Sequence, residues 1–250
     1  MAPDYPSQPH RSRYLPTPQR FPLFSLKAVQ ALLASLCLAS SAWAQLKVEG
    51  TRLIYLGQDR EASINVVNRS GEETVMQSWV SDPQGGDDIP FAIVQPLTLL
   101  PPQGHQMLRV LYAGQGLPTD RESMFWLNIL EIPRKPEHAD SMQFAIRQRL
   151  KLFYRPTGLQ GSTSDAVRDL QWHRHSQRIE ISNRSAFHLS LVDLALEGPG
   201  LHQPLTDYVL LQPGASITLD THSPVPAGSR VAFTEIADSG LLQSHSASLP

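Results

Sequence analysis

Two histidines form the residue pair in this chain that most suggests metal chemistry. His173 and His175 are separated by one residue, and on an extended strand this spacing puts both imidazoles on the same side. A zinc site needs three or four ligands, and the sequence places no third ligand beside the pair. The Gly-x-Ser-x-Gly, P-loop and Gly-x-Gly-x-x-Gly patterns are absent. The sequence therefore predicts no enzyme and no cofactor.

An apolar row near the middle of the chain suggests binding chemistry instead. Side chains alternate between the two faces of a strand, so Met142, Phe144 and Ile146 share one face. In the core of a sheet such a row is ordinary packing. At the edge of a sheet it would combine unpaired backbone groups with large apolar side chains, which is an aggregation hazard unless a partner covers it. Alternation alone leaves both interpretations open.

The elements that position these residues are predicted to be strands. Short runs alternate apolar and polar residues, are rich in Val, Ile, Leu and aromatic residues, and are bounded by turn residues, as in 62–67, 74–80, 106–112 and 123–132. Pro and Gly interrupt the chain too often for long helices, and no amphipathic helix is predicted. The fold class is therefore all-β.

A weak internal repeat predicts two similar domains. Ile64–Ser70 resembles Ile179–Ser185, and in each copy a Pro/Gly turn followed by a strand comes some thirty residues later. Short strands at this spacing suggest two immunoglobulin-like sandwiches. In each copy the Asn-Arg-Ser sequence is expected to mark a turn that the Asn side chain caps. We place the two domains at residues 45–156 and 157–250.

The first 44 residues are predicted to be a cleaved secretion signal. A polar, Arg-containing start leads into an apolar stretch too short for a membrane span, followed by Ala42-Trp43-Ala44. Cleavage before Gln45 would remove Cys37, the chain's single cysteine. The mature protein would then rely on its cores and not on disulfides. A net charge of −2 argues against nucleic-acid binding, and no further segment predicts membrane insertion.

Two segments carry a specific resemblance. Residues 117–133 read Leu-Pro-Thr-Asp-Arg-Glu-Ser-Met-Phe-Trp-Leu-Asn-Ile-Leu-Glu-Ile-Pro, and residues 142–156 end in Lys-Leu-Phe-Tyr-Arg-Pro. Both resemble the signature strands of the PapD-like periplasmic chaperones of pilus and fimbrial assembly. This resemblance implies two immunoglobulin-like domains in an L-shaped (boomerang) arrangement. It also implies a non-enzymatic protein of the periplasm whose partners are pilin subunits and an outer-membrane usher. The sequence leaves open whether the free protein associates with itself.

In that family, the strand matching Met142, Phe144 and Ile146 is donated to a pilin that lacks its own final strand, a form of strand addition. Arg52 and Lys151 match the family's cations that bind the carboxylate at the end of the subunit chain. Strict alternation puts Lys151 on the face opposite the apolar row, and Gln148 interrupts the row. A β-bulge or strong twist would reconcile these positions.

The resemblance also implies a charged trio between the two domains, formed by Glu122, Arg155 and Asp238. A loose surface network of little energetic value is the alternative interpretation of these charges. Two rival functions are a secreted immunoglobulin-like adhesion or ligand-binding module, which would use loops at the ends of the sandwiches, and a metal-dependent enzyme using His173 and His175.

Overall fold

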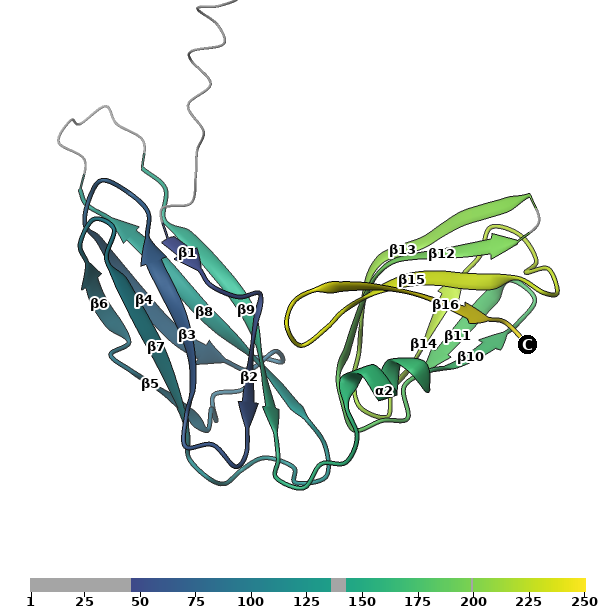
Figure 1. Cartoon of the computed structure of the whole chain (residues 1–250), viewed down its shortest axis with the longest axis horizontal. Helices are drawn as coiled ribbons and strands as arrows, with labels where there is room; N and C mark the ends of the chain where they lie inside the picture. The colour runs from purple at the N-terminus through teal and green to yellow at the C-terminus, as the bar shows by residue number, and fades with distance from the viewer. Residues whose placement is uncertain (1–45, 136–142, 199) are drawn as a thin grey trace, which may run out of the picture. The chain divides into compact units, whose positions relative to one another are not determined.

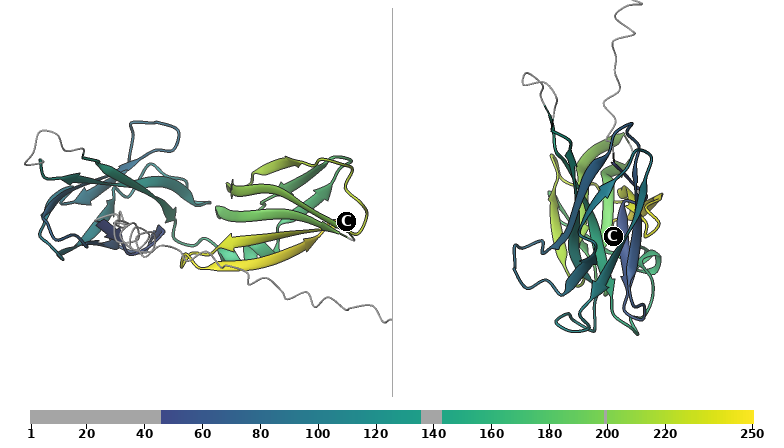
Figure 2. Two further views of the ribbon diagram at one scale, coloured as in Figure 1. Left: turned by 90° about the horizontal axis from the view of Figure 1, so that it is seen from above. Right: turned by 90° about the vertical axis from the view of Figure 1, so that its left-hand side faces the viewer.

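The computed structural model describes residues 46–135, 143–198 and 200–250, and nearly all of the regular secondary structure in this part of the chain is β-strand (Figure 1). The predicted signal at residues 1–44 and the apolar residue Met142 lie outside the described residues. Residues 44–250 form one compact unit. Within it, each half is built from strands that follow one another in the chain, coloured purple to teal in one half and green to yellow in the other (Figures 1 and 2).

The N-terminal half, residues 46–155, contains two sheets. The first has the order β1-β3-β7-β5, and its strands are β1 (Leu46–Val48), β3 (Ala62–Asn68), β7 (His105–Tyr112) and β5 (Phe91–Val94). The second has the order β2-β9-β8-β4-β6, and its strands are β2 (Arg52–Leu56), β9 (Ile146–Arg155), β8 (Ser123–Pro133), β4 (Thr74–Ser81) and β6 (Leu97–Leu100). Alternate residues of these strands are buried and form one core, which includes Val66, Met76, Leu108, Leu127 and Leu152.

The C-terminal half repeats this plan. One sheet has the order β10-β11-β14, made of β10 (Gln171–Arg174), β11 (Arg178–Ser182) and β14 (Ser216–Asp220). The other has the order β13-β12-β15-β16, made of β13 (Leu201–Leu211), β12 (Leu189–Gly198), β15 (Arg230–Ile236) and β16 (Leu242–Ser248). Its core is separate from the first and includes Trp172, Ile179, Leu191, Leu211 and Phe233.

The strands predicted from alternation are confirmed as β3, β4, β7 and β8. Long helices were not expected, and the described residues contain one short helix, α2 (Thr163–Arg168). Ser162 caps it by accepting a hydrogen bond from the Asp165 backbone N–H. Its capping residue and buried Ala166 and Val167 give the segment a helical pattern, but six residues are too few to stand out from a loop.

The internal repeat corresponds to a shared turn. Asn68 Oδ1 accepts a hydrogen bond from the Ser70 backbone N–H at 3.0 Å, and Asn183 Oδ1 accepts one from Ser185 at the same distance. Each Asn side-chain amide also donates to backbone carbonyls near the later Pro/Gly turn. Both Asn residues are buried. The expected Asn-capped turns are therefore confirmed, and each one ties two distant loops of its half together.

The chain changes sheets between its first two strands. β1 pairs with β3, whereas β2 pairs with β9 in the other sheet. The bend lies at Gly50, where a Cβ atom would come within 3.1 Å of Ile64 Cδ1. This switch delivers β2, and with it Arg52, to the side of β9.

Candidate functional site

Arg52 and Lys151 are brought together by the pairing of β2 with β9. The two strands run parallel, and Arg52 lies directly opposite Lys151 in their register. Neighbouring strands are about 5 Å apart, so two cations occupy adjacent positions at this point of the sheet. Like charges at this spacing repel each other, which makes the pair a site that an anion would stabilise.

The Arg52 guanidinium is fixed by contacts with both halves. Its Nη1 donates to the Ile236 carbonyl oxygen at 2.7 Å, and its Cζ lies 6.0 Å from the centre of the Phe153 ring. Burial lowers the pKa of Arg52, and the negative charge of Asp238 opposes the shift. Its Nε is buried and has no hydrogen-bond partner among the described residues. The Arg52 side chain therefore has donor capacity that its own fold does not use.

Lys151 has a similarly restricted environment. Its ammonium donates to Ser190 Oγ at 3.4 Å and lies 4.7 Å from the centre of the Tyr208 ring. Burial, together with the charge of Arg52, lowers the pKa of Lys151 to about 8. No carboxylate lies within ion-pair distance of either Arg52 or Lys151 in the described part of the chain. Ser190, Tyr208 and the Ile236 carbonyl were not predicted, because no sequence motif connects the C-terminal half to these cations.

The strand bearing the apolar row is partly unpaired. β8 pairs with β9 from Ile146 to Tyr154, but β2 covers the other edge only from Lys151 to Arg155. Residues 146–150 therefore present a free edge as far as the structure is described. Phe144, two residues before β9, is 71% exposed, and Ile146 is 40% exposed. The edge interpretation of the row is thus the one that the described residues fit.

The register of β9 against β8 runs without a break from Ile146 to Tyr154, so the β-bulge, one of the two suggested explanations, is absent from this stretch. Lys151 stays on the face opposite Ile146, where it meets Ser190 and Tyr208. Gln148 interrupts the apolar row because its side-chain amide donates to the Leu46 carbonyl at 2.8 Å. It ties β1 to β9 and so holds the two sheets together.

Glu122, Arg155 and Asp238 also meet. Arg155 Nε donates to Glu122 Oε1 at 2.7 Å, and its two terminal nitrogens donate to the two Asp238 oxygens at 2.6 Å each. The Glu122 side chain is fully buried. Its second oxygen accepts from the His188 backbone N–H at 2.7 Å and lies 3.0 Å from His188 Nδ1. His188 is a fourth member that the sequence did not reveal. The loose surface network is a poor description of this cluster.

The two histidines do not form a metal site with their neighbours. His175 Nε2 lies 3.4 Å from Glu180 Oε2, but no group of three potential ligands occurs among the described residues.

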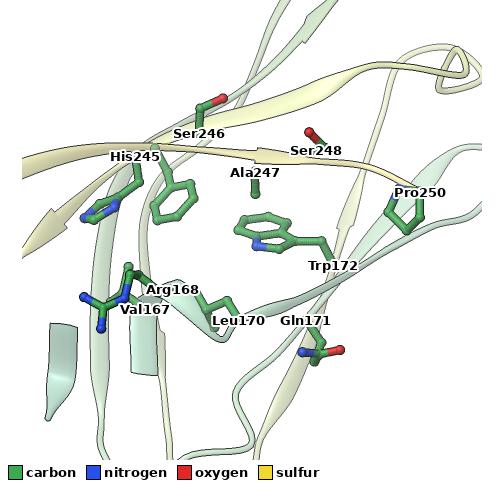
Figure 3. Close-up of a pocket in the computed structure, with 11 residues that line it drawn as sticks. Val167, Arg168, Leu170, Gln171, Trp172, His245, Ser246, Ala247, Ser248 and Pro250 are labelled. Atoms are coloured by element: carbon green, nitrogen blue, oxygen red, sulfur yellow. The ribbon is translucent and has the colours of Figure 1, made fainter. Parts of the chain in front are cut away.

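The hollow in Figure 3, about 560 Å³, lies in the C-terminal half between α2, β10 and β16. Trp172 and Ala247 line it, and none of the predicted site residues does. The described helix is not long and apolar enough to cross a membrane.

Comparison with known proteins links this geometry to a family. Residues 45–160 match the model for the N-terminal domain of PapD, a pili and flagellar-assembly chaperone, and residues 165–247 match the model for the C-terminal domain of the pili assembly chaperone PapD. The chaperone FimB/FhaD of Bordetella pertussis is 37% identical over 72% of this chain and 78% of its own length. The probable fimbrial chaperone LpfB of Escherichia coli O157:H7 is 39% identical over 64% of this chain and 71% of its own.

Solved structures agree. The crystal structure of the YadV chaperone superposes with a TM-score of 0.73 at 29% identity and covers 82% of this chain and all of that one. A Salmonella enterica complex of the SafA pilin with the SafB chaperone matches with a TM-score of 0.70 at 25% identity, over 84% of this chain and 97% of the matched chain. The chain therefore belongs to the PapD-like family of pilus-assembly chaperones, which are not enzymes.

Proposed function

We propose that this protein is a periplasmic chaperone that binds pilin subunits by lending them β9 and delivers them to an outer-membrane usher. The observation that carries the proposal is the free edge at residues 146–150, preceded by the exposed Phe144. Membership of the fimbrial chaperone family and the SafA–SafB complex of a related chaperone support a pilin as the partner. The predicted signal supports the periplasm as the compartment.

The edge supplies two kinds of interaction. Its unpaired backbone N–H and C=O groups would pair with a subunit strand, and the apolar side chains would enter the groove that the subunit's missing strand leaves open. Met142, Phe144 and Ile146 form this donor row. Full burial of a large apolar side chain stabilises a complex by about 1.5–3 kcal/mol. Two or three such side chains would keep a subunit folded while leaving it exchangeable.

Arg52 and Lys151 would fix the register of the bound strand. They are adjacent, unpaired by any carboxylate in the described chain, and partly buried. A carboxylate at the end of a subunit chain would accept charge-assisted hydrogen bonds from both. Because the anchor and the donor row lie on one strand, binding of the terminus at Lys151 would set which subunit pockets meet Phe144 and Ile146.

Co-expression with a pilin subunit in the periplasm tests the proposal. We expect a one-to-one complex, and we expect Phe144→Asp to weaken it by about 10- to 100-fold, the loss of one buried apolar side chain. Leu97→Asp is the matched control, since Leu97 is 64% exposed on β6 at the opposite edge of the same sheet. If the two substitutions weaken pilin binding equally, Phe144 does not belong to a donor row. If the unmodified protein binds no pilin, the alternative function, a secreted immunoglobulin-like ligand-binding module, is favoured.

Subunit binding is expected to depend on pH above about 8. A carboxylate binds the charged form of Lys151, whose pKa is lowered to about 8 by burial and by Arg52. Affinity should therefore be constant below this pH and fall as pH rises through it, by up to tenfold per pH unit. Calorimetry between pH 7 and 9 measures the effect. Lys151→Arg keeps its charge throughout this range, so its profile should be flat; a slope that persists in this variant would implicate another group.

A further inference from the structure

The face of the C-terminal half that meets Lys151 contains an ordered set of hydroxyl groups. Ser190 lies on β12, is buried, and accepts a hydrogen bond from Lys151 Nζ. Tyr208 lies on the neighbouring strand β13 and packs its ring against the same ammonium. Both residues are therefore in contact with the Lys151 ammonium.

The Tyr208 side chain brings a further donor to this place. A lysine ammonium only donates, so Ser190 Oγ accepts from Lys151. The phenol of Tyr208 has one O–H donor of its own. Tyr208 is 44% exposed, so this donor is accessible from outside the protein.

The remaining charges around Tyr208 also favour an anionic ligand. Burial raises the pKa of Tyr208, while nearby Ser190 and the Arg52 charge oppose the shift. The phenol therefore keeps its proton over the physiological range. Arg52, whose Nη1 is occupied by the Ile236 carbonyl and whose buried Nε has no partner, lies close enough to influence Tyr208 electrostatically. Lys151 thus has Arg52 opposite it in the sheet and the Tyr208 ring 4.7 Å from its ammonium.

We propose that Tyr208, packed against the Lys151 ammonium, is a third donor to the terminal carboxylate of a bound subunit and makes the anchor span both halves of the chaperone. This inference rests on the proposed function, because it concerns the ligand of the same anchor. A carboxylate has two oxygens and about four lone pairs, so it accepts from Arg52, Lys151 and Tyr208 together. Tyr208 is a specificity residue, because its neutral O–H donates to a carboxylate without adding a third charge to the site.

The test uses the mature chaperone and a synthetic peptide with the C-terminal sequence of a co-purified pilin, made as the free acid and as the C-terminal amide. Tyr208→Phe keeps the ring over Lys151 and removes only the O–H. We expect it to weaken binding of the acid about tenfold, the value of one hydrogen bond to a charged group. Binding of the amide should not change. Ser190→Ala should also weaken binding of the acid, because it removes the hydroxyl that accepts from the Lys151 ammonium and helps to hold it beside Tyr208.

Tyr112→Phe is the matched control, since it removes a phenol hydroxyl from the aromatic cluster of the N-terminal half. The proposal is overturned if Tyr208→Phe binds the acid as tightly as the unmodified chaperone, or if it weakens acid and amide equally, which would indicate packing alone. An unmodified chaperone that fails to distinguish acid from amide would instead contradict carboxylate anchoring itself. These outcomes separate a failure of the Tyr208 role from a failure of the proposed function.

Discussion

Arg52→Ala is expected to weaken the complex with a pilin subunit by at least a hundredfold. Truncating one partner of a buried, hydrogen-bonded charge pair at an interface costs about 2–5 kcal/mol, which is about 30- to 4,000-fold in affinity. Arg52 belongs at the upper end because its side chain is partly buried and its Nε has no other partner in the described chain. Co-purification from the periplasm and calorimetry with the purified pair measure the loss.

Two further substitutions sharpen this experiment. Lys151→Ala should have an effect of the same order, because the two cations would act on one carboxylate. Arg147→Ala is the control, because Arg147 is an exposed cation on the same strand, four residues before Lys151. This variant should bind the pilin as tightly as the unmodified chaperone. If Arg52→Ala and Arg147→Ala bind a pilin equally well while both remain folded, Arg52 does not anchor the subunit.

Arg155→Ala is expected to lower the free energy of unfolding by about 3 kcal/mol. Removing one partner of a buried ion pair typically costs about 3–5 kcal/mol because it leaves a buried charge uncompensated. In this variant the group left without its charge partner would be the fully buried Glu122 carboxylate, which would keep only its contacts with His188. Asp238 is partly exposed and can be solvated, so the lower end of the range is appropriate. Chemical denaturation followed by tryptophan fluorescence measures the change.

The matched control for Arg155 is Arg178→Ala. Arg178 Nε lies 2.9 Å from Asp220 Oδ1, but both side chains are exposed, and a pair of this kind contributes roughly 0–1 kcal/mol. The double variant Arg155→Met with Glu122→Gln should recover part of the stability, since it removes both charges of the buried pair. Similar losses from Arg155→Ala and Arg178→Ala would show that the buried cluster contributes no more than a surface pair.

The strands were predictable because their apolar residues alternate with period two, as in β3, where the odd-numbered residues are exposed or half-buried and the even-numbered ones are buried. The two turns at Asn68 and Asn183 were predictable because an Asn-x-Ser sequence satisfies its own backbone locally. Helix α2 was not, since its stability comes from burying Ala166 and Val167 against strands far away in the chain. Local patterns identify elements, but they do not identify contacts made only after folding.

The residues of the candidate site likewise fall into those that the sequence identifies and those that only the folded structure brings together. Arg52, Phe144 and Lys151 were recognised because they occupy positions of a sequence signature, and the apolar alternation of the donor row has a physical meaning of its own. Ser190 and Tyr208 have no such signal. They reach Lys151 because β12 and β13 pair with Val192 opposite Tyr208, and this register depends on a whole sheet. The contacts of Lys151 on the face opposite Ile146 were not predictable, because alternation along one strand does not show what its second face contacts.

The pairing of β2 with β9 also determines when, during folding, the chaperone becomes able to bind a subunit. The Gln148–Leu46 hydrogen bond beside this pair joins positions 102 residues apart in the chain. Contacts over such separations close late, and folds dominated by them reach the native state in milliseconds to seconds. A chain emerging from a membrane translocation channel, amino end first, would release Arg52 long before Lys151. The two cations would become neighbours only when the N-terminal half is nearly complete, so a half-finished chaperone would have no assembled anchor with which to capture a subunit.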